Sequence, residues 1–355
     1  MSRFLCDKYA PLKEYTPGEQ PQGMKFIKLN TNESPYPPSE NVITAAKQQA
    51  ELLNLYSDPQ AKELKKALAE RYGTEYENVF VSNGSDEILE FFFMAFCSDR
   101  KVAYPQISYG FYPVYAQLFG ADAEEIPLKD DLSIDHNDYV AINKNIVIAN
   151  PNAPTGICLT KNEIEQIVSS NKDNIVLIDE AYVDFGGESS VELVKKYDNI
   201  VVCMTFSKSR SLAGGRLGFC FANEKIIQDL EKIKYSTNPY NVNRMTQACG
   251  VEAIRNDGYY MQNAKKIICT REYLIGEYKA LGFEITDSKA NFIFASHSDI
   301  SGKELYEELR SHGILVRHFS TPRISNFVRI SIGTQEDIQT LVSVTKEILK
   351  ARRAL

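Results

Sequence analysis

Polar side chains follow an apolar stretch in the middle of the sequence and include the groups best suited to chemistry. The apolar residues 200–204 predict a buried strand, and the hydroxyls of Thr205 and Ser207, the amine of Lys208 and the guanidinium of Arg216 come after it. A lysine beside another cation and partly out of water loses some of its preference for the charged form, so it can attack a carbonyl and form a Schiff base. The hydroxyls and the guanidinium would bind a phosphate. Pyridoxal 5'-phosphate carries both an aldehyde and a phosphate, and is therefore the predicted cofactor.

Other predicted strands also end in polar segments. One is followed by 150–156 (Asn-Pro-Asn-Ala-Pro-Thr-Gly) and another by 179–182 (Asp-Glu-Ala-Tyr). Ligands of parallel sheets bind beyond the carboxyl ends of the strands, so we expect these segments to lie near Lys208. Earlier in the chain, Gly84 and Ser85 join a short strand to an apolar helix, a geometry that directs backbone N–H groups at an anion.

Together these segments resemble those of a known family. Residues 207–216 are similar to the lysine signature of the class I and II aminotransferases of fold type I, and 212–214 (Leu-Ala-Gly) are similar to the variant in members that use histidinol phosphate. The resemblance covers about residues 29–333. It implies an α/β fold with a large doubly wound, mostly parallel sheet domain and a smaller α+β domain.

The resemblance also implies a role for each matching residue. Lys208 would bind the cofactor aldehyde and act as the general base, while Asp179 would keep the pyridine nitrogen protonated. Tyr182 would donate a hydrogen bond to the phenolic oxygen of the ring, and Tyr109 would stack on the ring face. The phosphate contacts implied are Gly84, Ser85, Thr205, Ser207, Arg216 and, across a dimer interface, Tyr56 of the partner subunit, and Asp86 is a further predicted cofactor-binding residue.

One position departs from the family pattern. The family commonly has an asparagine immediately before Pro-Thr-Gly, where its amide bonds the ring oxygen, whereas this chain has Ala153. We expect Asn152 to take over the contact, and the alternative is that Tyr182 acts alone.

Two arginines are predicted to hold the anionic group of the substrate. Arg329 lies in 326–333 (Asn-Phe-Val-Arg-Ile-Ser-Ile-Gly), which resembles the carboxylate-binding motif of the family, and the same guanidinium could bind a phosphate ester. Arg317 is a plausible second cation. An arginine among apolar strand residues is costly to bury unpaired, which favours a binding role. Asn32, in the polar connector 29–38, is a further predicted substrate contact.

The elements that must position these groups form two predicted domains. Strands and helices alternate between residues 79 and 206, and the apolar runs do not alternate with polar residues, as in strands covered on both faces. Fewer strands in a different order follow. The prediction is an N-terminal arm over 1–28, rich in proline and glycine and packed across a dimer interface, a large cofactor-binding domain over 29–240 and a small domain over 241–355.

Composition sets limits on location and partners. The 355 residues are 43% hydrophobic and 25% charged with a net charge of -7, which favours neither nucleic acid nor an anionic membrane as a partner. Seven cysteines without C-x-x-C spacing predict reduced thiols, and the first residues show no signal-peptide pattern. The four histidines are scattered and predict no metal site. We expect a cytoplasmic homodimer that acts on small molecules.

The resemblance implies transfer of the amino group of L-histidinol phosphate to 2-oxoglutarate, giving imidazole acetol phosphate and L-glutamate in histidine biosynthesis. A threonine-phosphate decarboxylase and an aromatic amino acid aminotransferase share nearly every motif and stay open as alternatives. A regulator that senses pyridoxal phosphate is disfavoured because the chain has neither room for a DNA-binding domain nor a basic patch. A nicotinamide-binding enzyme would need G-x-G-x-x-G after the first strand, which is missing.

Overall fold

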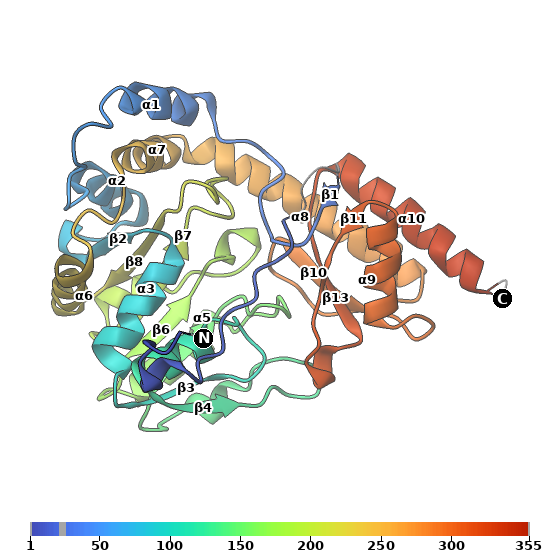
Figure 1. Cartoon of the computed structure of the whole chain (residues 1–355), viewed down its shortest axis with the longest axis horizontal. Coiled ribbons are helices and arrows are strands. Elements are labelled where there is room, and N and C mark those ends of the chain that lie inside the picture. Colours follow the sequence, from blue (N-terminus) through green and yellow to red (C-terminus); the bar gives the residue numbers. More distant parts are fainter. Residues whose placement is uncertain (1, 21–25, 354–355) are drawn as a thin grey trace.

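A seven-stranded sheet forms the middle of the large domain in the computed structural model, which describes residues 2–20 and 26–353 (Figure 1). Its order is β2-β8-β7-β6-β5-β3-β4; the pairs from β7 to β4 are parallel, and β8 runs antiparallel to both of its neighbours. The strands are β2 (Val79–Ser82), β3 (Lys101–Pro105), β4 (Asp122–Ile126), β5 (Asn145–Ala149), β6 (Val176–Asp179), β7 (Ile200–Thr205) and β8 (Gly218–Ala222). The predicted α/β fold with a mostly parallel sheet is confirmed.

Helices cover both faces of this sheet. In β5, Ile146 and Ile148 belong to one apolar core while Val147 between them belongs to the core on the opposite face, so successive residues of a continuous apolar run are all buried. The helices of this part of the chain are α1 (Glu40–Ala50), α2 (Lys62–Tyr72), α3 (Ser85–Phe92), α4 (Tyr112–Phe119), α5 (Lys161–Ser170), α6 (Glu224–Thr237) and α7 (Arg244–Arg255).

The second domain is built on a four-stranded antiparallel sheet of order β12-β13-β10-β9. Its strands are β9 (Glu284–Ile285), β10 (Phe292–Ser296), β12 (Arg317–His318) and β13 (Phe327–Ser331). Beside it, β1 (Ile27–Lys28) pairs in parallel with β11 (Ile314–Leu315). The long helix α8 (Asp257–Ala280) runs from the large domain to this one, where α9 (Gly302–Ser311) and α10 (Gln335–Arg353) also pack (Figure 1).

Short helical turns complete the described part of the chain. They are the 3-10 turns Asp7–Tyr9, Tyr76–Asn78, His136–Tyr139, Val183–Phe185, Val191–Lys195 and Pro322–Ile324, and the π-helical turn Phe93–Cys97 that extends α3. None of the helices within the described ranges combines the length and the hydropathy that crossing a membrane would require.

Some elements differ from the expectation. β8 was not predicted, nor were the two-residue strands β1 and β9. Asp58 and Pro59 are residue types typical of a helix start, but α2 begins only at Lys62, because Ala61 adopts a left-handed conformation (φ 46°) and the Asp58 carboxylate accepts from the N–H groups of Gln60 and Lys62.

The boundaries 1–28, 29–240 and 241–355 stay predictions. Helix α7 lies after residue 240, yet its Cys249 and Ala253 belong to the core of the large domain, which would place the boundary nearer the start of α8. Within the predicted arm, residues 1 and 21–25 lie outside the described residues, as do 354–355 at the end of the last predicted helix.

Candidate active site

Two adjoining cavities lie where the carboxyl ends of the central strands face the small domain. The inner cavity has a volume of about 340 Å³ and the outer one about 840 Å³, both within the range of small-molecule sites. The residues that line both are Thr31, Tyr109, Ala153, Tyr182 and Lys208. A ligand that spans the two cavities would therefore pass Lys208.

One end of the inner cavity is suited to an anion. Gly84 precedes α3 with φ 80°, and no side chain caps that helix, so its first N–H groups are left for a ligand. A Cβ on Gly84 would lie 2.6 Å from Arg216 Nη2, and one on Gly218 would lie 2.5 Å from the backbone nitrogen of Ser85. Only glycine lets the turn, the strand β8 and the guanidinium approach this closely.

Hydroxyl groups at the carboxyl end of β7 and just after it complete this end of the cavity. Thr205 Oγ1 lies 3.0 Å from Ser207 Oγ and accepts from the Ser207 N–H at 3.1 Å. The carboxylate of Asp86 accepts hydrogen bonds from Arg216 Nη2 at 2.8 Å and from the Tyr109 hydroxyl at 2.7 Å. This carboxylate holds the guanidinium and the aromatic ring at the edge of the cavity.

A buried carboxylate marks another wall of the inner cavity. Asp179 ends β6 and is 5% exposed; its oxygens accept from the Tyr112 hydroxyl at 3.1 Å and from the Ala181 N–H at 3.2 Å. Burial raises the pKa of Asp179 from 3.8 to about 6, partly opposed by these hydrogen bonds. Such a carboxylate gains most from a cationic ligand group that restores its charge.

Lys208 and Tyr182 stand between the two cavities. Lys208 Nζ donates to the Thr31 carbonyl at 3.3 Å and lies 5.7 Å from the centre of the Tyr182 ring. The Tyr182 hydroxyl accepts from Asn32 Nδ2 at 3.0 Å. An amine and a phenol thus line the same space, with Tyr109 at the same boundary.

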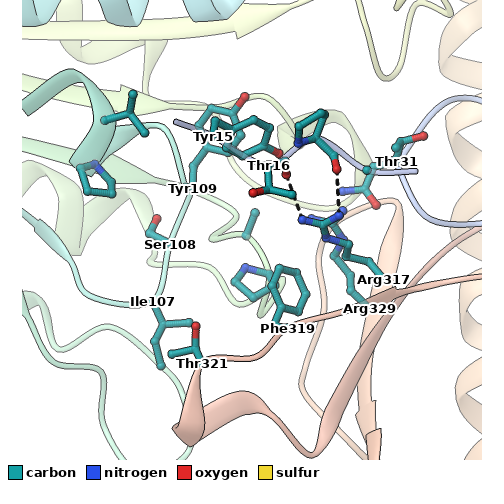
Figure 2. A pocket seen from close by; sticks show the side chains of 18 of the residues that line it. Tyr15, Thr16, Thr31, Ile107, Ser108, Tyr109, Arg317, Phe319, Thr321 and Arg329 are labelled. Carbon is teal, nitrogen blue, oxygen red and sulfur yellow. Dashed lines mark hydrogen bonds between the residues drawn. The ribbon is translucent and has the colours of Figure 1, made fainter. Parts of the chain in front are cut away.

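The outer cavity contains two guanidinium groups (Figure 2). Arg329 Nη2 donates to the Asn30 carbonyl at 3.1 Å, but its Nε is buried and has no hydrogen-bond partner among the described residues. Burial lowers the pKa of Arg329, and the nearby charge of Arg317 adds to this effect. A buried cation with an unsatisfied donor beside a second cation is a site that an anion would stabilise.

The N-terminal arm crosses the outer cavity. The carbonyls of Thr16 and Pro17 accept hydrogen bonds from Arg317 at 3.0 and 3.2 Å (Figure 2), and the Tyr15 ring stacks on Phe111 at 4.3 Å. The arm is fixed to both domains, since the Lys13 N–H donates to Gln117 of α4 and Glu19 pairs with Arg310 of α9. This segment therefore packs on its own chain. The described arm residues Phe4, Leu5 and Tyr9 are exposed, and their contact with a partner subunit stays a prediction.

The structure brings most of the predicted site residues together. Those that line the inner cavity are Ser85, Asp86, Tyr109, Asp179, Tyr182, Thr205, Ser207, Lys208 and Arg216. The outer cavity includes Asn32, Arg317 and Arg329, and Gly84 lies against Arg216. Sequence reasoning did not single out Thr31, Tyr15 or Phe319 as cavity residues. Their types carry no signal of it, because their position depends on how the arm and the small domain pack.

Besides Gly84, two predicted residues, Asn152 and Tyr56, line neither cavity. The Asn152 amide nitrogen donates to the Ile107 carbonyl at 3.0 Å and to Thr155 Oγ1 at 3.2 Å, and its oxygen accepts from Ser108 at 2.7 Å. This geometry does not favour the prediction that Asn152 contacts the cofactor, because both ends of the Asn152 amide already form hydrogen bonds with other residues of the protein. Tyr56 is 78% exposed and stacks on Tyr240 at 4.4 Å.

The sequence is similar to known proteins along nearly its whole length. The model of the family described as aminotransferase class I and II matches residues 24–344. The histidinol-phosphate aminotransferase of Brachyspira hyodysenteriae is 51% identical over 353 residues, which cover 99% of this chain and 100% of that protein. The histidinol-phosphate aminotransferase of Clostridium acetobutylicum is 48% identical over 352 residues, with 98% and 100% covered.

Solved structures agree with the fold. The crystal structure of histidinol-phosphate aminotransferase from Sinorhizobium meliloti in complex with pyridoxal 5'-phosphate superimposes with a TM-score of 0.86 at 22% identity and covers 92% of each chain. A likeness at this identity concerns the fold alone, and it confirms the predicted fold type I.

Proposed function

Since this chain belongs to the class I and II aminotransferases, we propose that it transfers the amino group of L-histidinol phosphate to 2-oxoglutarate, giving imidazole acetol phosphate and L-glutamate. Two relatives that are about half identical over their full length are histidinol-phosphate aminotransferases, which supports histidinol phosphate as the amino donor. The observation that carries the assignment is the presence of Lys208, Arg317 and Arg329 along one cavity, because a phosphate ester requires more positive charge than a carboxylate.

Pyridoxal 5'-phosphate is the cofactor of this enzyme, and the inner cavity fits it. The uncapped N-terminus of α3, Thr205, Ser207 and Arg216 would hold the phosphate, and the missing Cβ of Gly84 lets the Arg216 guanidinium lie against this turn. Asp179 would face the pyridine nitrogen. The bound cofactor supplies an aldehyde that takes up the amino group and a ring that withdraws electrons from the substrate α-carbon.

The residues around this position have distinct tasks. Asp179 would accept a hydrogen bond from a protonated ring nitrogen and so keep that nitrogen positive, while Tyr182 would donate a hydrogen bond to the ring oxygen. Lys208 Nζ would serve as the base of a 1,3-proton shift, taking the proton from the substrate α-carbon and returning it on the far side of the amino nitrogen. The arm, with Tyr15 over the outer cavity, limits the entry of water to these groups.

We also propose that the enzyme is a homodimer. Tyr56 stacks on Tyr240 in an exposed apolar patch that includes Leu52, Leu53 and Leu55, and a second copy of the chain would bury this patch. Tyr56 would then reach the phosphate site of the partner subunit. All seven cysteines are free thiols, which supports the cytoplasm as the location.

The anchor is tested by borohydride reduction of the purified protein followed by peptide mass spectrometry. We expect the visible absorption to disappear and the reduced cofactor to be attached to Lys208, and Lys208→Ala to have no transaminase turnover. An adduct on another lysine, or full activity of this variant, would refute the assignment.

The substrate is tested by comparing kcat/KM for histidinol phosphate, phenylalanine, tyrosine and threonine phosphate with 2-oxoglutarate as acceptor. Histidinol phosphate should be the best donor. A preference for phenylalanine or tyrosine would refute the proposed donor but leave the assignment as a transaminase intact. Release of carbon dioxide from threonine phosphate would indicate a decarboxylase instead.

A further inference from the structure

The Tyr182 hydroxyl has a hydrogen-bond partner that the motifs do not reveal. Its ring packs edge-on against Phe292, with the ring centres 5.1 Å apart, and its oxygen accepts from Asn32 Nδ2 at 3.0 Å. A phenol has one proton to donate and lone pairs to accept with. The amide of Asn32 occupies the accepting side, which leaves the Tyr182 proton to be donated into the inner cavity that this residue lines.

The orientation of the Asn32 amide is fixed by its own contacts. Asn32 Oδ1 accepts from Ser331 Oγ at 2.8 Å, so Nδ2 is the end of the amide that faces Tyr182. The backbone is held as well, since the Asn32 N–H donates to Ser331 Oγ at 2.8 Å and Asn291 Nδ2 donates to the Asn32 carbonyl at 2.9 Å. With φ 56° and only 1% of its surface exposed, Asn32 has little freedom to turn.

The loop at 150–156 does not supply an equivalent amide. Ala153 lines both cavities but offers only a methyl group, and the Asn152 side chain is used within its own turn. Among the described residues, Asn32 has the one amide that bonds Tyr182. We propose that Asn32 is the positioning residue that makes Tyr182 a hydrogen-bond donor toward the cofactor, supplying from the small-domain side the amide that Ala153 lacks.

This inference rests on the proposed function, in which Tyr182 faces the cofactor ring oxygen. A hydrogen bond donated to that oxygen favours its ionised form and lowers the pH at which the visible absorption of the holoenzyme titrates. If the proton of Tyr182 is no longer directed into the cavity, the titration midpoint should rise. Protein folding alone would not move this midpoint, so the measurement separates positioning from a structural role.

The test is a pH titration of the visible absorption of the Asn32→Gly holoenzyme. Glycine adopts φ 56° without strain, so the variant removes the amide and keeps the backbone contacts. We expect the midpoint to rise by about one pH unit, the size expected for one hydrogen bond. Asn143→Gly is the matched control, because Asn143 is an exposed asparagine with nearly the same φ (52°) and is remote from the cavities; its midpoint should equal that of the wild type.

A double-mutant cycle with Tyr182→Phe decides whether Asn32 acts through Tyr182. Tyr182→Phe alone should raise the midpoint at least as much as Asn32→Gly, and adding Asn32→Gly to it should change nothing further. If Asn32→Gly does not fold, Ser331→Ala frees the same amide without altering residue 32 and should give a smaller rise. Ala153→Asn added to Asn32→Gly should restore part of the lower midpoint.

Two results would overturn the inference. One is an unchanged titration midpoint in a folded, yellow Asn32→Gly enzyme. The other is that Asn32→Gly raises the midpoint as much in the Tyr182→Phe variant as it does in the wild type. A failure of the proposed function looks different, because a wild-type protein without the cofactor has no visible absorption to titrate.

Discussion

Asp179→Asn should stabilise the protein freed of cofactor while abolishing catalysis. Asparagine has the same shape as aspartate, and its Oδ1 can still accept from the Ala181 N–H while its Nδ2 donates to the Tyr112 hydroxyl. The substitution therefore removes a buried charge, keeps the hydrogen bond from Ala181 and reverses the direction of the one with Tyr112. Catalysis should fall by several orders of magnitude, since a preorganised charge is lost from the pyridine nitrogen.

The magnitude follows from the pKa of Asp179, which burial raises from 3.8 to about 6. Below pH 3.8 the carboxyl is protonated in the folded and unfolded states alike. Between 3.8 and about 6 the folded state holds the proton more tightly, so the stability that protonation contributes is lost as the pH rises through this window. The full loss corresponds to roughly 3 kcal/mol, of which roughly 1.5 kcal/mol falls between pH 5 and pH 8.

The assay is urea unfolding of both proteins, without cofactor, at pH 5 and pH 8, followed by circular dichroism. The advantage of Asp179→Asn should grow by about 1.5 kcal/mol between the two pH values. Added pyridoxal phosphate should remove this stability advantage, because a cationic ring nitrogen would pair with the charged Asp179 of the wild type only.

Glu180→Gln is the matched control for this assay. Glu180 is the adjacent residue, it is also buried, and burial raises its pKa from 4.5 to about 7, but it lines neither cavity and accepts hydrogen bonds from Ser189 and Ser190. Its substitution should also stabilise the protein at pH 8, and this gain should persist when the cofactor binds. The reasoning is refuted if Asp179→Asn gains nothing at pH 8, or if its gain survives cofactor binding as that of Glu180→Gln does.

Three further predictions concern other parts of the site. Mixing inactive Tyr56→Ala and Lys208→Ala subunits should restore some activity through one intact hybrid site, and no recovery despite subunit exchange would count against a shared site. Arg329→Ala should lower kcat/KM in both half-reactions, by an amount that corresponds to roughly 2–5 kcal/mol of transition-state stabilisation. Arg317→Ala should affect the two half-reactions unequally, and equal losses would show that Arg317 does not distinguish the substrates. Arg210 is 1% exposed and paired with two carboxylates, so Arg210→Met should lower the free energy of unfolding by about 3–5 kcal/mol. A loss below about 1 kcal/mol would mean that the ion pairs are dispensable.

The groups that sequence analysis could place are those at the ends of the central strands. Continuous apolar runs identify β5, β6 and β7, and parallel strands bring the residues that follow them to one edge, which is why Asp179, Tyr182 and Lys208 could be grouped in advance. β8 was missed because Gly218–Ala222 is short and follows a glycine-rich segment, so its pattern does not differ from that of a turn.

The contacts that could not be predicted depend on packing between distant segments. Asn152 has the residue type expected of a ring contact, but its amide completes the turn that includes Thr155. Tyr15 reaches the outer cavity only because the arm bonds to both domains, through Gln117 and Arg310. Neither outcome follows from local propensity or spacing, since each depends on which of several possible partners lies nearest in the fold.

The segment 30–32 shows how the two halves of the site are joined. Successive residues contact three proposed site residues, because the Asn30 carbonyl accepts from Arg329, the Thr31 carbonyl accepts from Lys208 and the Asn32 amide donates to Tyr182. The same segment is bonded to the small domain through Ser331. Lys208 and Tyr182 belong to the large domain, so a displacement of the small domain reaches both of them through three adjacent residues. Binding of an anion at Arg329 and proton transfer at Lys208 are therefore expected to respond to the same movement.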